Sequence, residues 1–308
     1  MTGPSTGSVT HPLRADSFRA KYEAAAARNH SLLCVGLDPD PALLPPGVDV
    51  ADFLRAIIEA TADLVCCYKP NAAFFEPDGA AGWQTLKAVI DAVPDDVPVL
   101  LDAKRGDVGH TSEAYARAVF ETLGADAVTA NPYLGADGLE PFFTYEDHHT
   151  FVLCRTSNAG SRDFQDLLVS APAPRPDRDQ TGAPSPAIRD GEVGSDSGAL
   201  RPLYEHVAML ANRWNTRGNV GLVVGATYPD EAARVRSLCP ELLFQLPGIG
   251  APQGDVEVAG RASDDAQGGG ILSNSSRGIL YASRSDDFAA AARGEALRLR
   301  DTINAARR

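Results

Sequence analysis

The sequence predicts an α/β protein, a single (β/α)8 TIM barrel with one disordered insertion. Apolar runs of strand length recur eight times along the 308 residues, and segments with helical spacing lie between them. Near-continuous apolar strands that alternate with helices are typical of a parallel sheet covered on both faces. When two polar segments without apolar periodicity are left out, the remaining length is close to the ~250 residues that are typical of one closed barrel.

The eight expected strands are 32–37, 64–70, 97–103, 126–131, 150–156, 219–226, 241–246 and 269–275. Helices are expected where apolar residues recur at three- and four-residue intervals, in 51–63, 80–93, 111–123, 135–145, 203–215 and 229–239. Helix breakers follow these segments at Pro94, Gly124, Gly218 and Pro240. The periodicity and the breakers therefore agree on where the elements begin and end.

Two segments do not fit the alternation. Residues 171–199 are rich in Pro, Gly, Ser and charge and show no apolar periodicity, and residues 1–15 are similar. We expect a flexible N-terminal segment over 1–15 and one domain over 16–308, with a flexible insertion at about 171–199.

Composition excludes several classes of protein. The net charge is −13 and no basic stripe offsets it, which argues against a nucleic-acid surface. No uninterrupted apolar stretch of about 18 residues and no signal-peptide layout are present, so we expect a cytoplasmic protein that does not enter a membrane. The five cysteines lie in apolar runs without CxxC spacing, which favours buried small hydrophobes over a zinc site or disulfides.

Polar side chains collect where the expected strands end, which is the catalytic rim of this kind of barrel. The chain contains four lysines, and two of them follow apolar strands. The polar residues at these strand ends are Asp38, Lys69, Asn71, Asp102, Lys104, Asn131, Thr156, Ser157 and Asn158.

Asp102 and Lys104 are two residues apart at the end of one strand, so we expect both to point towards the barrel mouth. Asp38 and Lys69, from neighbouring strands, can converge on them. A lysine between carboxylates stays protonated, which favours a proton donor over a Schiff-base nucleophile. The alternative is a structural salt-bridge network that closes the barrel.

An anion site is expected after the last two strands. Gly248, Gly250 and Gly254 let backbone N–H groups approach a ligand, and Arg277 in the next loop offers a bidentate donor. The combination favours a phosphate monoester over a plain turn. The cluster Glu146-Asp147-His148-His149 has metal-ligand residue types but precedes the fifth strand, on the opposite rim, so we expect no metal there.

Six motifs, in this order along the chain, resemble orotidine 5′-phosphate decarboxylases of the branch with long loops. They are YKPNAAFFE, DAKRGDVGHTSEAYA, TSNAGSRDFQ, GLVVGATYP, LPGIGAPQGD and NSSRGILYAS. The resemblance runs from about residue 16 to the C-terminus and is interrupted mainly by 171–199.

The resemblance implies a homodimeric barrel that converts orotidine 5′-monophosphate to uridine 5′-monophosphate and CO2 without a metal or organic cofactor. By motif position, Lys104 donates a proton to C6, Asp102 flanks it, and Asp107 and Thr111 act in the partner's site. The remaining carried-over roles are ribose binding by Asp38 and Lys69, pyrimidine contact by Ser157 and Gln253, and phosphate binding by Gln253 and Arg277.

Two other functions stay open at this point. Magnesium-dependent sugar-phosphate decarboxylases and hexulose-phosphate synthases resemble this barrel and share an Asp-x-Lys-x-x-Asp pattern, which here is Asp102, Lys104 and Asp107. A noncatalytic phosphate-binding barrel is the second alternative. The YKPN and TSN motifs, with their long loops, favour the nucleotide substrate over the magnesium-dependent alternative.

Overall fold

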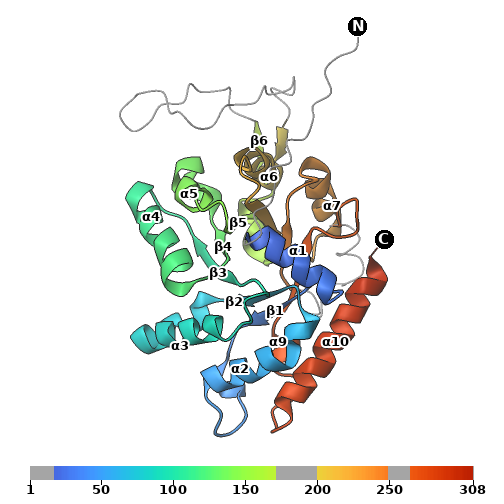
Figure 1. The fold of residues 1–308 in the computed structure, drawn as a ribbon. Coiled ribbons are helices and arrows are strands. Elements are labelled where there is room, and N and C mark those ends of the chain that lie inside the picture. Colours follow the sequence, from blue (N-terminus) through green and yellow to red (C-terminus); the bar gives the residue numbers. More distant parts are fainter. Residues whose placement is uncertain (1–16, 171–199, 249–263, 308) are drawn as a thin grey trace.

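The computed structural model describes residues 17–170, 200–248 and 264–307, and it is an eight-stranded parallel barrel (Figure 1). Each strand coincides with one of the eight apolar runs, so the predicted fold class is confirmed. The strands are β1 Leu33–Leu37, β2 Cys67–Pro70, β3 Leu100–Arg105, β4 Ala127–Ala130, β5 His149–Arg155, β8 Val220–Val224, β9 Phe244–Leu246 and β10 Ile271–Ser275.

The sheet runs in the order β2-β1-β10-β9-β8-β5-β4-β3, and two single parallel bridges, Tyr68 to Val99 and Asn71 to Asp102, join its ends. Every neighbouring pair is parallel, so the carboxyl ends of all eight strands lie at one rim. This arrangement brings Asp38, Lys69, Asp102 and Ser157, which are distant in sequence, to the same end of the barrel.

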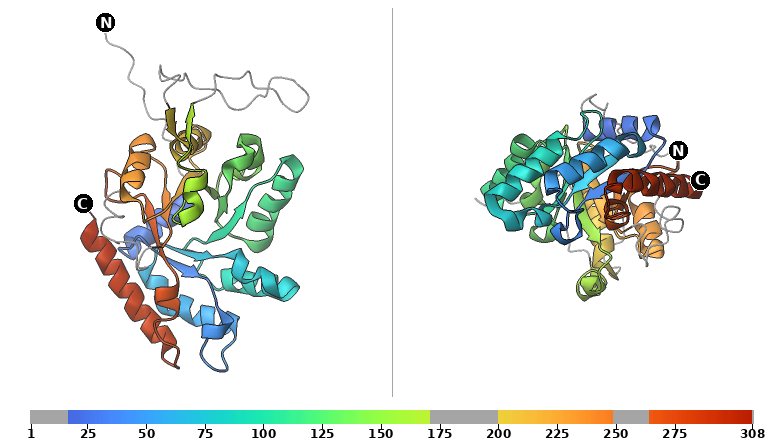
Figure 2. Two further views of the ribbon diagram at one scale, coloured as in Figure 1. Left: turned by 180° about the vertical axis from the view of Figure 1, so that it is seen from behind. Right: turned by 90° about the horizontal axis from the view of Figure 1, so that it is seen from below.

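Helices cover the outside of the ring (Figure 2). Where they were predicted, their apolar faces pack on the strands; α2, for example, buries Phe53, Leu54, Ile57 and Ile58. The helices are α1 Phe18–Arg28, α2 Val50–Thr61, α3 Gly79–Asp91, α4 Gly109–Arg117, α5 Ala136–Phe143, α6 Leu203–Trp214, α7 Pro229–Leu238, α9 Arg277–Leu280 and α10 Phe288–Ala306.

Besides the short helix α9, four features were not predicted. Two Ala-rich helices flank the barrel: α1, which begins at the capping residue Ser17, and α10. The helix expected over 111–123 changes at Ala118 to a π-helical turn, which ends at Gly124 with φ 76°. A small antiparallel sheet of β6 Leu168–Ser170 and β7 Leu200–Pro202 joins the two sides of the expected insertion.

The two segments expected to be flexible, 1–15 and 171–199, lie outside the described residues. All five cysteines are buried, as predicted. No helix in the described part of the chain is long and apolar enough to cross a membrane.

Candidate active site

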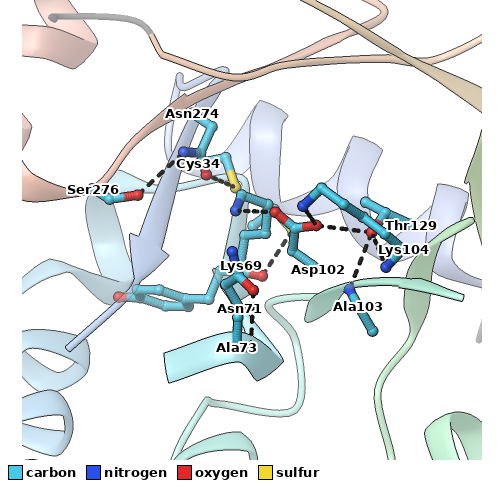
Figure 3. Close-up of polar contacts among 12 residues, drawn as sticks. Cys34, Lys69, Asn71, Ala73, Asp102, Ala103, Lys104, Thr129, Asn274 and Ser276 are labelled. Carbon is cyan, nitrogen blue, oxygen red and sulfur yellow. Dashed lines mark hydrogen bonds and ion pairs between the residues drawn. The ribbon is translucent and has the colours of Figure 1, made fainter. Parts of the chain in front are cut away.

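Three charged side chains from adjacent strands meet at the carboxyl rim. The Asp102 carboxylate lies between two ammonium groups: Oδ2 accepts a hydrogen bond from Lys69 Nζ at 3.0 Å, and Oδ1 accepts one from Lys104 Nζ at 2.6 Å (Figure 3). The Lys69 side chain is only 4% exposed, whereas that of Lys104 is 50% exposed. Lys69 is therefore part of the floor of the site, and Lys104 is open to a ligand.

Mutual attraction keeps Lys69 and Asp102 charged. Burial lowers the pKa of Lys69, but the carboxylates of Asp102 and Asp38 outweigh burial and hold this pKa above its usual value. Burial likewise raises the pKa of Asp102, yet Lys69 and Lys104 outweigh it and hold this pKa well below its usual value. A fixed carboxylate beside two lysines is thus the stable state at neutral pH.

Lys104 reaches Asp102 by a different backbone route from the one expected. Simple strand alternation does not hold, because Lys104 has φ 49°, in the left-handed region that residues with a Cβ rarely adopt. The register between β3 and β4 also shifts between Leu101 and Arg105. The predicted meeting of Asp102 and Lys104 is confirmed, but the alternation argument for it was wrong.

Asp38 follows β1 and lies close enough to Lys69 for its charge to raise the lysine pKa. Its Oδ1 is buried and has no hydrogen-bond partner among the described residues. A buried carboxylate oxygen without a donor costs free energy, and a ligand hydroxyl would supply one. The predicted convergence on Asp102 is therefore observed for Lys69, which contacts the carboxylate at 3.0 Å, whereas within the described residues Asp38 makes no direct contact with Lys69, Asp102 or Lys104.

A polar row that the sequence analysis missed supports the rim between β1 and β10. Cys34 Sγ donates to Asn274 Oδ1 at 3.5 Å, and Asn274 Nδ2 donates to Ser276 Oγ at 3.3 Å (Figure 3). Ser276 lies against Gly36, where an added Cβ would stand 1.8 Å from Ser276 Oγ. The absence of a side chain at Gly36 thus makes room for Ser276, next to Arg277.

Ser157 lies in the loop after β5, and a partly buried hydrogen-bond network fixes that loop. The Gln165 side chain accepts from Thr156 N at 2.9 Å and donates to Thr156 Oγ1 at 2.8 Å. Arg155, fully buried, donates to Gln165 Oε1 at 3.3 Å, and its guanidinium lies 4.2 Å from the centre of the Tyr228 ring. Ser157 is therefore held at the rim by its neighbours.

Other predicted residues lie apart from this cluster. Asp107 Oδ1 accepts from Val108 N at 2.7 Å, and Thr111, in the first turn of α4, is partly buried. Within the described residues, neither joins the contacts of Lys69, Asp102 and Lys104. Arg277 opens α9 and is exposed. Gln253, with Gly250 and Gly254, lies outside the described residues.

The candidate metal cluster at 146–149 is a packing element at the opposite end of the barrel. His149 is buried between Phe18 and Phe151, with ring centres 5.2 and 4.8 Å away. Burial lowers the pKa of His149 to about 3, so its ring is neutral. In the part of the chain that the structure describes, no group of three or more His, Cys, Asp or Glu could hold a metal ion.

Thr129 is the other site residue that sequence reasoning missed. Its hydroxyl, on β4, contacts the Asp102 carboxylate and the backbone of β3 (Figure 3). A signal was present, because Thr129 is the hydroxyl residue in the apolar strand that follows the charged one. Its role, however, depends on the register between β3 and β4.

Comparison with known proteins points to one family. The family model described as "Orotidine 5′-phosphate decarboxylase / HUMPS family" matches residues 31–175. A protein named orotidine 5′-phosphate decarboxylase from Roseiflexus castenholzii is 49% identical over 298 residues, which cover 95% of this chain and 99% of that protein. One of the same name from Cupriavidus necator is 47% identical over 296 residues, which cover 94% of this chain and 98% of the relative.

Solved structures that resemble this chain come from the same family. The structure of the Leishmania donovani OMP decarboxylase has a TM-score of 0.73 at 42% identity, and the match covers 94% of this chain and 98% of that one. The identities extend over nearly the whole of each protein, so they include the barrel and its rim. The chain therefore belongs to the orotidine 5′-phosphate decarboxylase family of carboxy-lyases.

Proposed function

We propose that this chain converts orotidine 5′-monophosphate to uridine 5′-monophosphate and CO2, as a cytoplasmic enzyme of pyrimidine biosynthesis whose catalytic domain is residues 16–308. The observation that carries the proposal is the Lys69–Asp102–Lys104 row at the catalytic rim, with Lys104 Nζ 2.6 Å from Asp102 and half exposed to a ligand. The names of relatives that are 47–49% identical favour this reaction over the magnesium-dependent alternative.

The chemistry requires stabilisation of negative charge at one carbon. Breaking the bond between C6 and the carboxylate leaves the electron pair on C6 when CO2 departs. The ammonium of Lys104, oriented by its hydrogen bond to Asp102, opposes that developing charge. A fixed cation in a site walled by buried side chains stabilises such charge more than water does, because it needs no reorganisation.

Proton transfer completes the reaction. Lys104 gives one proton to the C6 electron pair, forming the C6–H bond and leaving a neutral amine that regains its proton from solvent. Asp102 and Lys69 remain paired throughout, with their 3.0 Å contact, so the charged floor does not change. No electron is transferred to another group, and the step balances without a metal or organic cofactor.

The remaining proposed roles concern substrate binding. The partnerless Asp38 Oδ1 and buried Lys69 suit hydroxyl groups of the ribose. By motif position, Ser157 and Gln253 contact the pyrimidine, and Gln253 and Arg277 bind the phosphate. Phosphate contacts remote from C6 contribute binding energy that is expressed in the transition state.

We further propose a homodimer in which Asp107 and Thr111 complete the partner's site. Large apolar side chains are exposed beside these residues on the loops after β3 and β4: Val108 is 50% exposed, Tyr133 81% and Leu134 47%. Exposed apolar surface of this kind favours association. In the described monomer the Asp107 carboxylate faces Val108 and not Lys104, which leaves Asp107 available to another subunit.

The primary test follows the absorbance loss of orotidine 5′-monophosphate. We expect turnover by the wild type, unchanged after EDTA treatment, and a rate at least ~10³-fold lower for Lys104→Ala, because charge stabilisation and proton donation are both lost. Loss of activity on chelation would contradict the cofactor-free reaction. A wild type that binds uridine 5′-monophosphate without turnover would instead support the noncatalytic barrel.

A mixing experiment tests the shared site. Lys104→Ala and Asp107→Ala are each expected to be inactive, but a mixed dimer has one site with both residues intact. Equal mixing with subunit exchange should restore about one quarter of wild-type activity, since half the dimers are mixed and each has one working site. If Asp107 serves its own subunit, the mixture stays inactive, and sedimentation showing an active monomer would also exclude sharing.

A further inference from the structure

We infer that Thr129 is a positioning residue for Lys104 and Asp102, an inference that rests on the proposed function. Thr129 lies on β4, is 1% exposed and faces the end of β3. It does not contact the open part of the site. Its effect on the reaction would therefore pass through the two charged residues that it holds.

The Thr129 hydroxyl uses its full hydrogen-bonding capacity. Oγ1 accepts from Ala103 N at 3.1 Å and from Lys104 N at 3.0 Å, and it donates to Asp102 Oδ1 at 2.9 Å (Figure 3). A hydroxyl has two acceptor lone pairs and one donor hydrogen. Because both lone pairs face backbone N–H groups, the hydrogen is directed at the carboxylate.

The backbone contacts matter because Lys104 is in an unfavourable conformation. Its φ of 49° is left-handed, and among the described residues other than glycine only His30 shares a positive φ. A non-glycine residue keeps such a conformation only where its surroundings compensate for the strain. Thr129 compensates here by pairing two consecutive amide groups that the shifted β3–β4 register leaves without ladder partners at this point.

The carboxylate contact extends the effect to the proton donor. Asp102 Oδ1 accepts both from Thr129 and from Lys104 Nζ, so one hydroxyl fixes the main chain of Lys104 and the oxygen that orients its ammonium. Thr129 thereby controls both ends of the Lys104 side chain. Small displacements of a reacting group are sufficient to lower a rate strongly.

The test compares removal of the Thr129 hydroxyl with removal of the hydroxyl of Thr150 on the neighbouring strand. Thr129→Val keeps the shape of the side chain and loses all three hydrogen bonds, whereas Thr129→Ser keeps the hydroxyl. Thr150→Val is the matched control, because Thr150 is buried on the neighbouring strand β5 and its Oγ1 has no hydrogen-bond partner among the described residues. Thr129→Ala is a second hydroxyl-free variant in case Thr129→Val does not fold.

For decarboxylation we expect Thr129→Val to lower kcat by about 10²-fold, with KM changed less than about threefold. Thr129→Ser should lie within about fivefold of wild type, and Thr150→Val should not differ from it. A folded Thr129→Val with wild-type kcat overturns the inference. So does a serine variant as slow as the valine variant, because the hydroxyl would then not be the cause.

A second readout does not depend on turnover. With only four lysines in the chain, lysine-selective 13C and 15N labelling gives four side-chain signals, and Lys104→Arg identifies that of Lys104. We expect the Lys104 signal to move in Thr129→Val and to stay in place in Thr150→Val. An unmoved signal overturns the inference. If the wild type fails to decarboxylate, the proposed function fails, and this spectrum still decides the role of Thr129.

Discussion

The two ends of the barrel differ in how their charged side chains are paired. At the amino end of the strands, α1 lies across the barrel (Figure 1). Its Lys21 pairs with Asp126 at 2.6 Å. The other Asp126 oxygen accepts from Val99 N at 2.8 Å. At the carboxyl end, Asp38 Oδ1 has no partner within the described residues, and Lys104 leaves half of its side chain exposed.

This difference indicates that the amino end serves mainly to stabilise the fold and that the carboxyl rim serves mainly to bind and convert a ligand. At the amino end, Phe18 packs on His149 and Phe151, and Tyr22 donates to Ile271 O at 2.9 Å, so the side chains there pack against one another, and the buried His149 Nε2 and Thr150 Oγ1 have no hydrogen-bond partner among the described residues. At the carboxyl rim, hydrogen-bonding capacity is left for a ligand. We therefore expect changes at the amino end to affect unfolding, and changes at the rim to affect turnover.

The largest contrast should come from Lys104→Ala against Phe18→Ala. The first should remove activity and leave Tm within a few degrees of wild type, because Lys104 is half exposed. Phe18→Ala should cost about 3–5 kcal/mol of unfolding free energy, or roughly 10 °C in Tm, and leave kcat unchanged at 25 °C. Calorimetry with the absorbance assay measures both quantities. A Phe18→Ala protein that is stable but inactive would break the contrast.

A smaller effect should appear as a pH dependence of stability at the amino end. Burial lowers the folded-state pKa of His149 from 6.5 to about 3, so below about pH 6.5 the unfolded chain takes up a proton that the folded chain does not. Stability should fall as the pH decreases, by about 2 kcal/mol at pH 5 relative to neutral pH. The variant His149→Phe should lose less stability over that range in urea titrations.

The rim should not contribute to that loss at pH 5. The pKa of Asp102 is already lowered in the folded state, so its stabilisation is present above its unfolded value near 3.8 and is lost only as the pH falls further. If His149→Phe loses as much stability as wild type between pH 7 and pH 5, another buried group is responsible.

Sequence alone was sufficient for the barrel, because parallel strands buried on both faces have a distinct apolar pattern and a polar rim. It placed Lys69, Asp102 and Lys104 together correctly, since strand ends in such a barrel share one rim. It missed α1, whose Ala-rich sequence has little amphipathic contrast, and it also missed α10. It also missed Thr129 and the left-handed Lys104, because both depend on a shift of register between β3 and β4.

The contact between Gly36 and Ser276 constrains the order in which substitutions at these two rim positions can occur during evolution. An alanine at 36 would overlap with the serine, while a glycine at 276 would leave room for it. Of the two substitutions, only the loss of the serine side chain can come first without a clash. Each residue thus sets which changes the other tolerates, although they are 240 positions apart in the sequence.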